Sequence, residues 1–372
     1  MLLNEKAWYE INNVDQLDSP ALVIYADRVK KNIQTLINNV SHIDQLRPHV
    51  KTHKCIEATE LMILAGINKF KCATIAEAEM LAMSKSKDVL LAYQPNRPKM
   101  KRFIKLIEKY PTTKFSCLVD HIAIAEQLAD AAQKNGITIS VYLDLNVGMN
   151  RTGIAPENAF QLCKKIAELP SLSFMGLHAY DGHIDETDFV KRTHECMEIY
   201  NRVLGLKEML VANGFEKVEL IMGGSPSFPI YAQLKDVECS PGTFVYWDGN
   251  YQNSLPEQNF LPAALVVGRI ISMPSPELLT VDIGHKSISS EYELSRRVRF
   301  LNAPDLHAVS HSEEHLVLKA PENHSYQMGD VLYALPSHIC PTCALYEHAV
   351  SIKDRELDKI WKIVARDRKI GV

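Results

Sequence analysis

A lysine stands directly after a short apolar segment in the run Arg47-Pro48-His49-Val50-Lys51-Thr52-His53-Lys54. We interpret residues 46–50 as a core strand, which puts Lys51 at its C-terminal end. Burial lowers the pKa of an amine, and a neutral amine can attack a carbonyl carbon to form a Schiff base. A structural role is the commoner one for a lysine at a strand end, with its aliphatic part packed and its ammonium group in solvent. Lys51 alone leaves both interpretations open.

Two further segments have residue types that bind anions. Arg151 lies between Gly148 and Gly153, and its guanidinium stays charged at any working pH, so it could hold a phenolate or carboxylate. It could also only bridge two segments of the fold. The run Gly223-Gly224-Ser225-Pro226-Ser227 is typical of a phosphate-binding loop, because glycines let backbone N–H groups approach an anion and serine hydroxyls add donors. An ordinary tight turn would have the same composition.

A histidine and a cysteine near the C-terminus have the chemistry of metal ligands. His338 and Cys340 are two residues apart, so in an extended segment their side chains point to the same side. An imidazole and a thiolate are ligands that suit zinc. Two protein ligands leave open positions for water or substrate. Cys340 and Cys343 also form a CxxC pattern, which is either coincidental or a redox pair without the strand-then-helix setting of a thioredoxin motif.

Short apolar runs alternate with amphipathic helical patterns over the first two thirds of the chain. We predict strands at residues 21–25, 46–50, 69–73, 89–93, 114–119, 138–145, 172–178 and 218–222, with a further short one at 239–245. Eight strand–helix units predict an α/β protein with a closed (β/α)8 barrel of the TIM type. An open doubly wound sheet competes with it, but residues 25–28 lack the glycine fingerprint that usually follows its first strand.

Catalytic groups of such barrels lie at the C-terminal ends of the strands. The strand ends therefore give a list of candidates. They are Lys51 and His53 after the second strand, Arg151 after the sixth, His178, Tyr180, Asp181 and His183 after the seventh, and residues 223–227 after the eighth. His178 and Tyr180 could equally be packing residues, because buried aromatic rings are common at strand ends.

The pattern changes after about residue 249. Strand-like runs at residues 263–271, 278–282, 315–319 and 331–335 are separated by turn residues, with a helical pattern only near the C-terminus. With 372 residues, two domains are the default expectation. We predict a barrel domain at residues 20–250 and a mostly β domain at 251–372 that contains the metal ligands. Residues 1–19 are expected to associate with the β domain.

Bulk composition excludes several classes of function. The net charge is −4, which gives no electrostatic case for binding nucleic acid or a membrane surface. The N-terminus lacks the layout of a signal peptide, and no apolar run approaches the roughly 20 residues of a membrane span. Eight scattered cysteines fit reduced thiols better than a disulfide framework. We therefore expect a cytoplasmic protein.

Taken in order, these segments resemble the fold type III pyridoxal-phosphate enzymes, which have an alanine racemase-like N-terminal domain. The resemblance is to the D-serine dehydratase and D-threonine aldolase group in particular and covers essentially the whole chain. It is carried by residues 47–54, Gly223-Gly224-Ser225-Pro226, Pro241-Gly242-Thr243, Ser312-Glu313-Glu314-His315 and His338-Ile339-Cys340.

The resemblance implies roles for these residues. Lys51 would carry pyridoxal 5'-phosphate as a Schiff base, Arg151 would lie near its phenolic oxygen, and Tyr180 would contact it. Gly223, Gly224 and Ser225 would bind its phosphate. His338 and Cys340 would hold a divalent metal beside the substrate hydroxyl, with zinc favoured by the thiolate and Mn²⁺ or Mg²⁺ as alternatives. The resemblance also implies a homodimer acting on a small D-amino acid.

Four activities remain open. The leading hypothesis is a dehydratase, in which metal-assisted β-elimination converts a D-3-hydroxy amino acid to a keto acid and ammonia. Retro-aldol cleavage to glycine and an aldehyde would use the same residues, and the cysteine ligand favours the dehydratase only slightly. In the related alanine racemases an arginine faces the pyridine nitrogen, where this chain has Ser240, which puts a racemase role in doubt. A non-catalytic pyridoxal-phosphate carrier would have no use for an open metal site.

Overall fold

The computed structural model describes residues 7–372 and divides the chain into two compact units, each built from several segments. The first, here called the barrel unit, comprises residues 36–51, 59–242 and 367–372. The second, here called the β unit, comprises the described residues up to 35, together with 52–58 and 243–366. Among residues 7–372, no helix is both long and apolar enough to cross a membrane.

Seven parallel strands in sequence order form the sheet of the barrel unit. They are β2 (Lys69–Cys72), β3 (Asp88–Leu91), β4 (Lys114–Val119), β5 (Ile139–Leu145), β6 (Leu172–Ala179), β7 (Glu219–Met222) and β8 (Val237–Cys239). Residues 46–50 join the two edges of this sheet, because Leu46 bridges Cys239 and His49 bridges Lys71, both in parallel. The sheet thus closes into a ring of eight, and the predicted α/β barrel class is confirmed.

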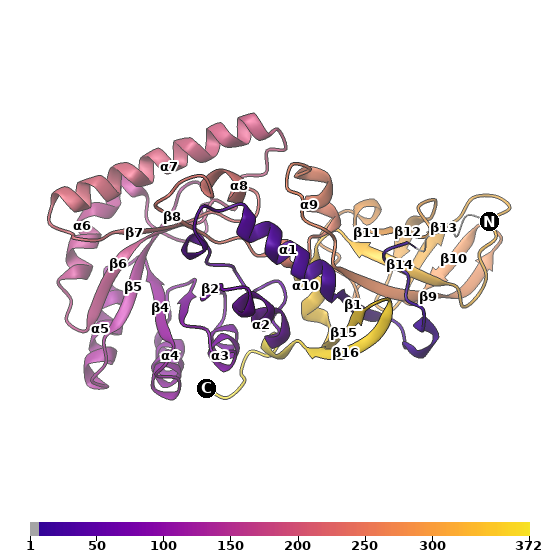
Figure 1. The fold of residues 1–372 in the computed structure, drawn as a ribbon, viewed down its shortest axis with the longest axis horizontal. Helices are drawn as coiled ribbons and strands as arrows, with labels where there is room; N and C mark the ends of the chain where they lie inside the picture. The colour runs from indigo at the N-terminus through magenta and orange to yellow at the C-terminus, as the bar shows by residue number, and fades with distance from the viewer. Residues whose placement is uncertain (1–6) are drawn as a thin grey trace. The chain divides into compact units, whose positions relative to one another are not determined.

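Helices follow the strands of the barrel unit and surround them (Figure 1). They are α2 (Ile56–Leu64), α3 (Ile75–Met83), α4 (Arg97–Lys109), α5 (Ile122–Lys134), α6 (Pro156–Ala167), α7 (Phe189–Ala212) and the short α8 (Phe228–Tyr231). In α4, Met100, Phe103, Ile104 and Leu106 are buried at the three- and four-residue spacing of a single helix face, while lysines occupy the opposite face.

One predicted barrel strand belongs to the other unit. Strand β1 (Ala21–Tyr25) pairs antiparallel with β9 (Ala264–Ser275) and parallel with β15 (His348–Lys353), so its prediction as the first barrel strand is wrong. An apolar run that is buried on both faces fits any interior sheet, and its pattern does not indicate which strand it pairs with. Residues 46–50 are therefore the first strand of the barrel, and the short β8 is its eighth.

The β unit is built on a nine-stranded sheet. Besides β1, β9 and β15 it contains β10 (Leu278–Val281), β11 (Val298–Phe300), β12 (His307–His311), β13 (Leu316–Lys319), β14 (Val331–Pro336) and β16 (Glu356–Lys362). The four predicted strand runs are confirmed as β9, β10, β13 and β14. The helical pattern expected near the C-terminus is wrong, since that stretch forms β15 and β16. Helices α9 (Gly249–Ser254) and α10 (Ile339–Leu345) lie in this unit, and α1 (Ala26–Asn38) begins in it.

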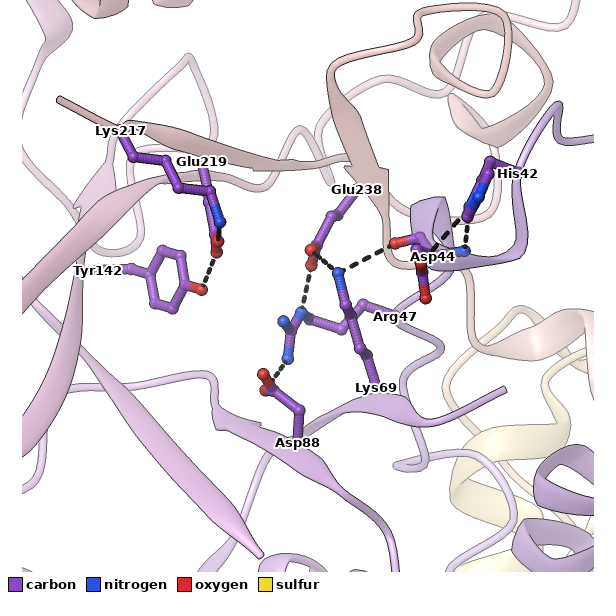
Figure 2. A network of polar contacts seen from close by, with 9 residues as sticks. All are labelled: His42, Asp44, Arg47, Lys69, Asp88, Tyr142, Lys217, Glu219 and Glu238. Atoms are coloured by element: carbon purple, nitrogen blue, oxygen red, sulfur yellow. Dashed lines mark hydrogen bonds and ion pairs between the residues drawn. The ribbon is translucent and has the colours of Figure 1, made fainter. Parts of the chain in front are cut away.

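A buried arginine ties together the amino-terminal ends of the barrel strands (Figure 2). Arg47 is 1% exposed; its Nη1 lies 2.5 Å from Asp88 Oδ1 at the start of β3, and its Nε lies 2.6 Å from Glu238 Oε2 in β8. Lys69, which begins β2, also pairs with Glu238. This network lies at the end of the strands opposite to Lys51. Arg47 therefore holds the closing segment 46–50 in place.

Candidate active site

A cavity of about 320 Å³ opens at the C-terminal ends of the barrel strands. Lys51, Arg151 and Tyr180, which the sequence places at three different strand ends, all line it. Lys71, Asp144 and His178 line it as well. The structure thus brings together three of the predicted site residues, together with the strand-end candidate His178.

The phenol ring of Tyr180 lies among three cationic side chains. The Lys51 Nζ is 5.6 Å from the ring centroid, the Lys71 Nζ is 5.5 Å from it, and the Arg151 Cζ is 5.1 Å from it. Such distances are within the range of cation–π attraction. Two glycines crowd the ring, because a Cβ at Gly182 would lie 2.3 Å from Tyr180 Cε1 and one at Gly224 would lie 3.0 Å from Cε2. Tyr180 is therefore held at the wall of the cavity.

An imidazole and a carboxylate form the cavity wall beside Lys71. His178 Nδ1 lies 2.7 Å from Asp144 Oδ1, and His178 Nε2 lies 3.4 Å from Lys71 Nζ. Burial, and then the charge of Lys71, lower the pKa of His178 despite the opposing effect of Asp144. Burial would raise the pKa of Asp144, but the hydrogen bond from His178 more than offsets it and the pKa is lowered. A neutral imidazole thus donates from Nδ1 to a carboxylate and accepts at Nε2.

The sequence analysis missed Lys71 and Asp144. Lys71 lies within β2 between the buried residues Phe70 and Cys72, and it is itself 2% exposed. Burial, and then the charge of Lys51, lower its pKa to about 7. A lysine inside a buried strand was the available signal, since lysines are almost never fully buried without a reason. Asp144 had the same signal within β5.

The glycine–serine loop follows β7, which is the seventh strand of the ring and not the last. Most of its polar groups have partners within the chain. The Gly223 N–H donates to Ala179 O, and the Gly224 N–H donates to Ser227 Oγ at 3.1 Å. Ser225 Oγ accepts from the Gly242 N–H at 3.4 Å. A phosphate at this loop would therefore meet Ser225 more readily than the N–H groups of the two glycines.

Three other strand-end candidates do not line the cavity. Asp181 is buried and accepts a hydrogen bond from Ser227 Oγ at 2.9 Å, so it supports the glycine–serine loop. His183 packs against Gly148, where an added Cβ would lie 2.4 Å from its Nε2. His53 is buried in the β unit, with its Nδ1 3.2 Å from the backbone nitrogen of Cys55.

Ser240 has an unusual environment. Its hydroxyl is buried, and none of the residues 7–372 hydrogen-bonds to it. A buried hydroxyl without a partner is unfavourable, and such groups commonly mark the place of a water or ligand atom. Ser240 stands where the sequence analysis expects the arginine of alanine racemases, so this position has a hydroxyl that can donate or accept a hydrogen bond.

The two predicted metal ligands adjoin one another in the β unit. The expectation of an extended segment is wrong, because α10 begins at Ile339; His338 caps it and Cys340 lies in its first turn. The two side chains still hydrogen-bond to each other. His338 Nδ1 also lies 2.5 Å from Glu291 Oε2, and Cys340 Sγ lies 3.1 Å from Thr52 Oγ1. Within residues 7–372, no group of three or more His, Cys, Asp or Glu side chains is placed to hold a metal.

The neighbouring cysteine has a different character. Cys343 is fully buried, and burial raises its pKa well above that of a free thiol. All eight cysteines of the chain are free thiols in the structure. The buried, protonated Cys343 is poorly suited to thiol–disulfide exchange, which requires a thiolate. The burial of Cys343 thus argues against Cys340 and Cys343 as a redox pair.

Known proteins of similar length resemble this chain over nearly all of it. It is 25% identical to D-threonine aldolase from Arthrobacter sp over 362 residues, 94% of this chain and 93% of the aldolase. It is 25% identical to 3-hydroxy-D-aspartate aldolase from Paracoccus denitrificans (strain Pd 1222), covering 95% and 93%. It is 22% identical to D-threo-3-hydroxyaspartate dehydratase from Delftia sp. (strain HT23), covering 89% and 93%.

Solved structures show the same fold. The crystal structure of D-threonine aldolase from Filomicrobium marinum superposes with a TM-score of 0.84 at 25% identity, covering 94% of this chain and 95% of the aldolase. Two variants of D-threo-3-hydroxyaspartate dehydratase show this fold. One has alanine in place of a histidine, and the other has alanine in place of the cysteine two positions further on. The histidine variant superposes with a TM-score of 0.81 at 20% identity, covering 93% of this chain and 95% of the variant. The cysteine variant superposes with a TM-score of 0.80 at 20% identity, covering 93% and 97%. The cysteine variant is in the metal-free form.

Two family patterns together cover most of the chain. The alanine racemase N-terminal domain matches residues 24–249, which include the whole ring of strands, and the putative serine dehydratase domain matches residues 263–352, which include His338 and Cys340. The chain therefore belongs to the alanine racemase N-terminal domain family and, with its serine dehydratase domain, is a fold type III pyridoxal-phosphate enzyme.

Proposed function

We propose that this protein is a pyridoxal-phosphate- and metal-dependent lyase that eliminates water from a D-3-hydroxy amino acid, after which the elimination product takes up water again and hydrolyses to a keto acid and ammonia. The observation that carries the proposal is the barrel cavity, where Lys51, Arg151 and Tyr180 line one space of about 320 Å³. That end of a (β/α)8 barrel is where catalytic groups gather. The names of the similar proteins support lyase chemistry on D-3-hydroxy amino acids.

Pyridoxal phosphate is anionic, aromatic and an aldehyde, and it fits two residues of the cavity, Lys51 and Arg151, together with Ser225 and Ser240 on the loops after β7 and β8. Lys51 offers an amine for the aldehyde, and Arg151 a permanent positive charge for the phenolic oxygen. Ser225 offers a donor for the phosphate, and the unpartnered hydroxyl of Ser240 a contact for the ring nitrogen. When bound, the cofactor would supply an electron sink for the carbanion formed at the substrate's α-carbon.

The chain's own residues would perform the proton transfers and the positioning. Lys51 Nζ would remove the α-proton of the substrate. Arg151 and Tyr180 would orient the cofactor beside it, since their side chains lie within 5.1 Å of each other, guanidinium to ring centroid. His178 would act as a fixed hydrogen-bond acceptor, because Asp144 holds its Nδ1 proton. These assignments leave Lys51 as the mobile base.

The residues His338 and Cys340 fit a divalent metal held by two protein ligands. Their side chains are in hydrogen-bond contact, so both can reach one ion. Burial lowers the pKa of His338, but Cys340 and Glu291 more than offset it and raise it to about 9, so metal binding would release a proton. The thiolate favours zinc over Mn²⁺ or Mg²⁺. When bound, the metal would act as a Lewis acid on a hydroxyl leaving group.

A similar protein supports this metal assignment. The dehydratase variant that lacks the cysteine of a His-x-Cys pair is in the metal-free form, and this chain has the same spacing at His338 and Cys340. Homodimeric assembly, which the sequence resemblance implies, belongs to the same proposal.

Aldol cleavage is the second candidate. Two of the similar proteins are aldolases at 25% identity, whereas the dehydratase is at 22%. The same Lys51, Arg151 and metal pair would serve, but a base would have to take the proton of the β-hydroxyl in place of the α-proton. The products would then be glycine and an aldehyde.

A product assay separates the candidates. The protein, supplied with pyridoxal phosphate and Zn²⁺ or Mn²⁺, is incubated with D-serine, D-threonine and D-threo-3-hydroxyaspartate. Ammonia with a keto acid supports dehydration, and glycine with an aldehyde supports aldol cleavage. Racemised substrate without either product pair would overturn both. Turnover that survives chelation would overturn the metal requirement.

A further inference from the structure

Lys71 is a second lysine of the cavity, and the function proposed above gives it no part. It projects from β2 into the space that Lys51 enters, and both amino groups lie within 5.6 Å of the centroid of the Tyr180 ring. Only 2% of Lys71 is exposed. Burying an amino group at this depth costs free energy unless the group is hydrogen-bonded.

The position of the Lys71 amino group is fixed from behind. Asp144 Oδ1 takes the Nδ1 proton of His178 at 2.7 Å, which leaves the lone pair of Nε2 facing Lys71 Nζ at 3.4 Å. An ammonium and a neutral amine both have N–H groups to donate to this acceptor. Lys71 can therefore gain or lose a proton without losing its hydrogen bond.

The charges around Lys71 are mostly positive. The charges of Lys51, Asp144, Asp181 and, from the opposite end of the strands, Arg47 act on Lys71. The other titratable groups around it in the cavity are His49 on the closing segment, His178 on β6, and Arg151 and Tyr180 on the loops. Asp144 and Asp181 are the acidic members of this set, and Asp144 is already paired with His178. Burial, and then Lys51, bring the pKa of Lys71 to about 7. Its charge is thus poised to change under working conditions.

We propose that Lys71 is a positioning residue of the cofactor pocket: held by His178 and Asp144, its amino group sets the charge that the Lys51 nitrogen meets and so how tightly that nitrogen holds its proton when the cofactor is bound. The inference rests on the proposed function. Lys51 must hold a proton at one stage and accept one at another, so a neighbouring charge that can be switched on and off matters to both.

The test is a pH titration of the visible absorbance of the cofactor bound through Lys51. The variants are Lys71→Met, which removes the charge, Lys71→Gln, which keeps an N–H donor for His178, and Lys71→Arg, which stays charged. Exposed Lys87→Met is the control. Because the two amino groups lie 5.6 and 5.5 Å from one ring centroid, they are at most about 11 Å apart. At an effective dielectric constant of about 20, removing a full positive charge at that distance should raise the apparent pKa of the Lys51 nitrogen by at least about one unit in the Met and Gln variants. The Arg variant should not raise it, and the control should match the wild type.

The outcomes are distinguishable. Met and Gln variants that titrate like the wild type, with circular dichroism showing an intact fold, would overturn this inference and leave the proposed function standing. A rise in Lys71→Arg equal to that in Lys71→Met would overturn it too, because a purely steric role would then explain both. If Lys71→Met fails to fold, the Gln and Arg variants still decide. A wild-type protein that binds no cofactor through Lys51 would overturn both proposals.

Discussion

His178 and Asp144 stand directly opposite each other on neighbouring parallel strands, with His178 Nδ1 2.7 Å from Asp144 Oδ1. Both are buried, so the hydrogen bond lies in a region of low effective dielectric, where it is stronger than in water. It turns the imidazole so that Nε2 accepts, while burial, and then the charge of Lys71, lower the pKa of His178 and favour its neutral form. This pair thus forms a polar wall of the cavity, on which the Lys71 amino group rests.

Lys51→Ala should abolish the visible absorbance of bound pyridoxal phosphate, because the amine that links to the aldehyde is gone. The matched control is Lys87→Ala, an exposed lysine that should change nothing. Lys71 lines the same cavity and could be the linked amine instead. Reduction of the wild-type protein with borohydride followed by peptide mass spectrometry separates the two lysines. A modified peptide containing Lys71 and not Lys51 would show that the wrong amine was chosen.

Gly182→Ala should weaken cofactor binding through Tyr180. The added Cβ would lie 2.3–2.6 Å from three atoms of the phenol ring, so the ring must move. Overpacking of about 1–3 kcal/mol corresponds to a Kd for pyridoxal phosphate that is about 5 to 150 times higher, measured by fluorescence titration. Gly205→Ala in α7 is the control, since no atom lies within 4 Å of its Cβ position. Equal affinities in the two variants would mean that Tyr180 does not depend on Gly182.

The barrel could be predicted from the sequence because each of its strands and helices has its own local pattern of apolar residues. The local sequence does not indicate which strands pair, and for this reason the prediction puts residues 21–25 in the wrong sheet. The candidates at strand ends followed from a rule about barrels, and Lys51, Arg151 and Tyr180 do line one cavity. Lys71 and Asp144 were missed because they lie within strands, where only the closed ring turns them toward the same space.

His338→Ala and Cys340→Ala should each reduce bound zinc by at least tenfold, because each removes one of the two protein ligands of the proposed site. Metal content after dialysis, measured by mass spectrometry, checks this. Exposed His348→Ala in the same unit is the control and should keep its metal. The visible absorbance of the cofactor should persist in all three variants. Full metal content in Cys340→Ala would contradict the assignment.

Arg47→Met should destabilise the barrel unit strongly. It would leave the carboxylates of Asp88 and Glu238 without the guanidinium that pairs with both, and breaking a buried ion pair from one side costs about 3–5 kcal/mol. Arg202→Met is the control, because its pair with Glu157 lies on the surface, where such pairs contribute at most about 1 kcal/mol. Urea unfolding followed by circular dichroism measures both. Similar midpoints for the two variants would show that Arg47 does not hold the closing segment.

His53 should make the protein sensitive to mild acid. Its ring is 1% exposed, and its Nδ1 accepts from the backbone N–H of Cys55 at 3.2 Å, so a proton added in acid would go to Nδ1, would face that donor and would break this hydrogen bond. Burial lowers the pKa of His53 to about 3, whereas in the unfolded chain it is about 6.5. Between these values the unfolded chain binds a proton at His53 that the folded chain does not. Stability contributed by the neutral ring is therefore lost as the pH falls from about 6.5 toward 3.

The substitution His53→Asn isolates this effect, because the Asn Oδ1 can still accept from the backbone N–H of Cys55, which lies 3.2 Å from His53 Nδ1. From pH 7 to pH 5 the wild type should lose about 2 kcal/mol more unfolding free energy than the variant. Urea unfolding at the two pH values measures the difference. Because all other titrating groups are shared, parallel losses in the two proteins would mean that the folded chain also takes up a proton at His53 in this pH range, and would contradict the prediction.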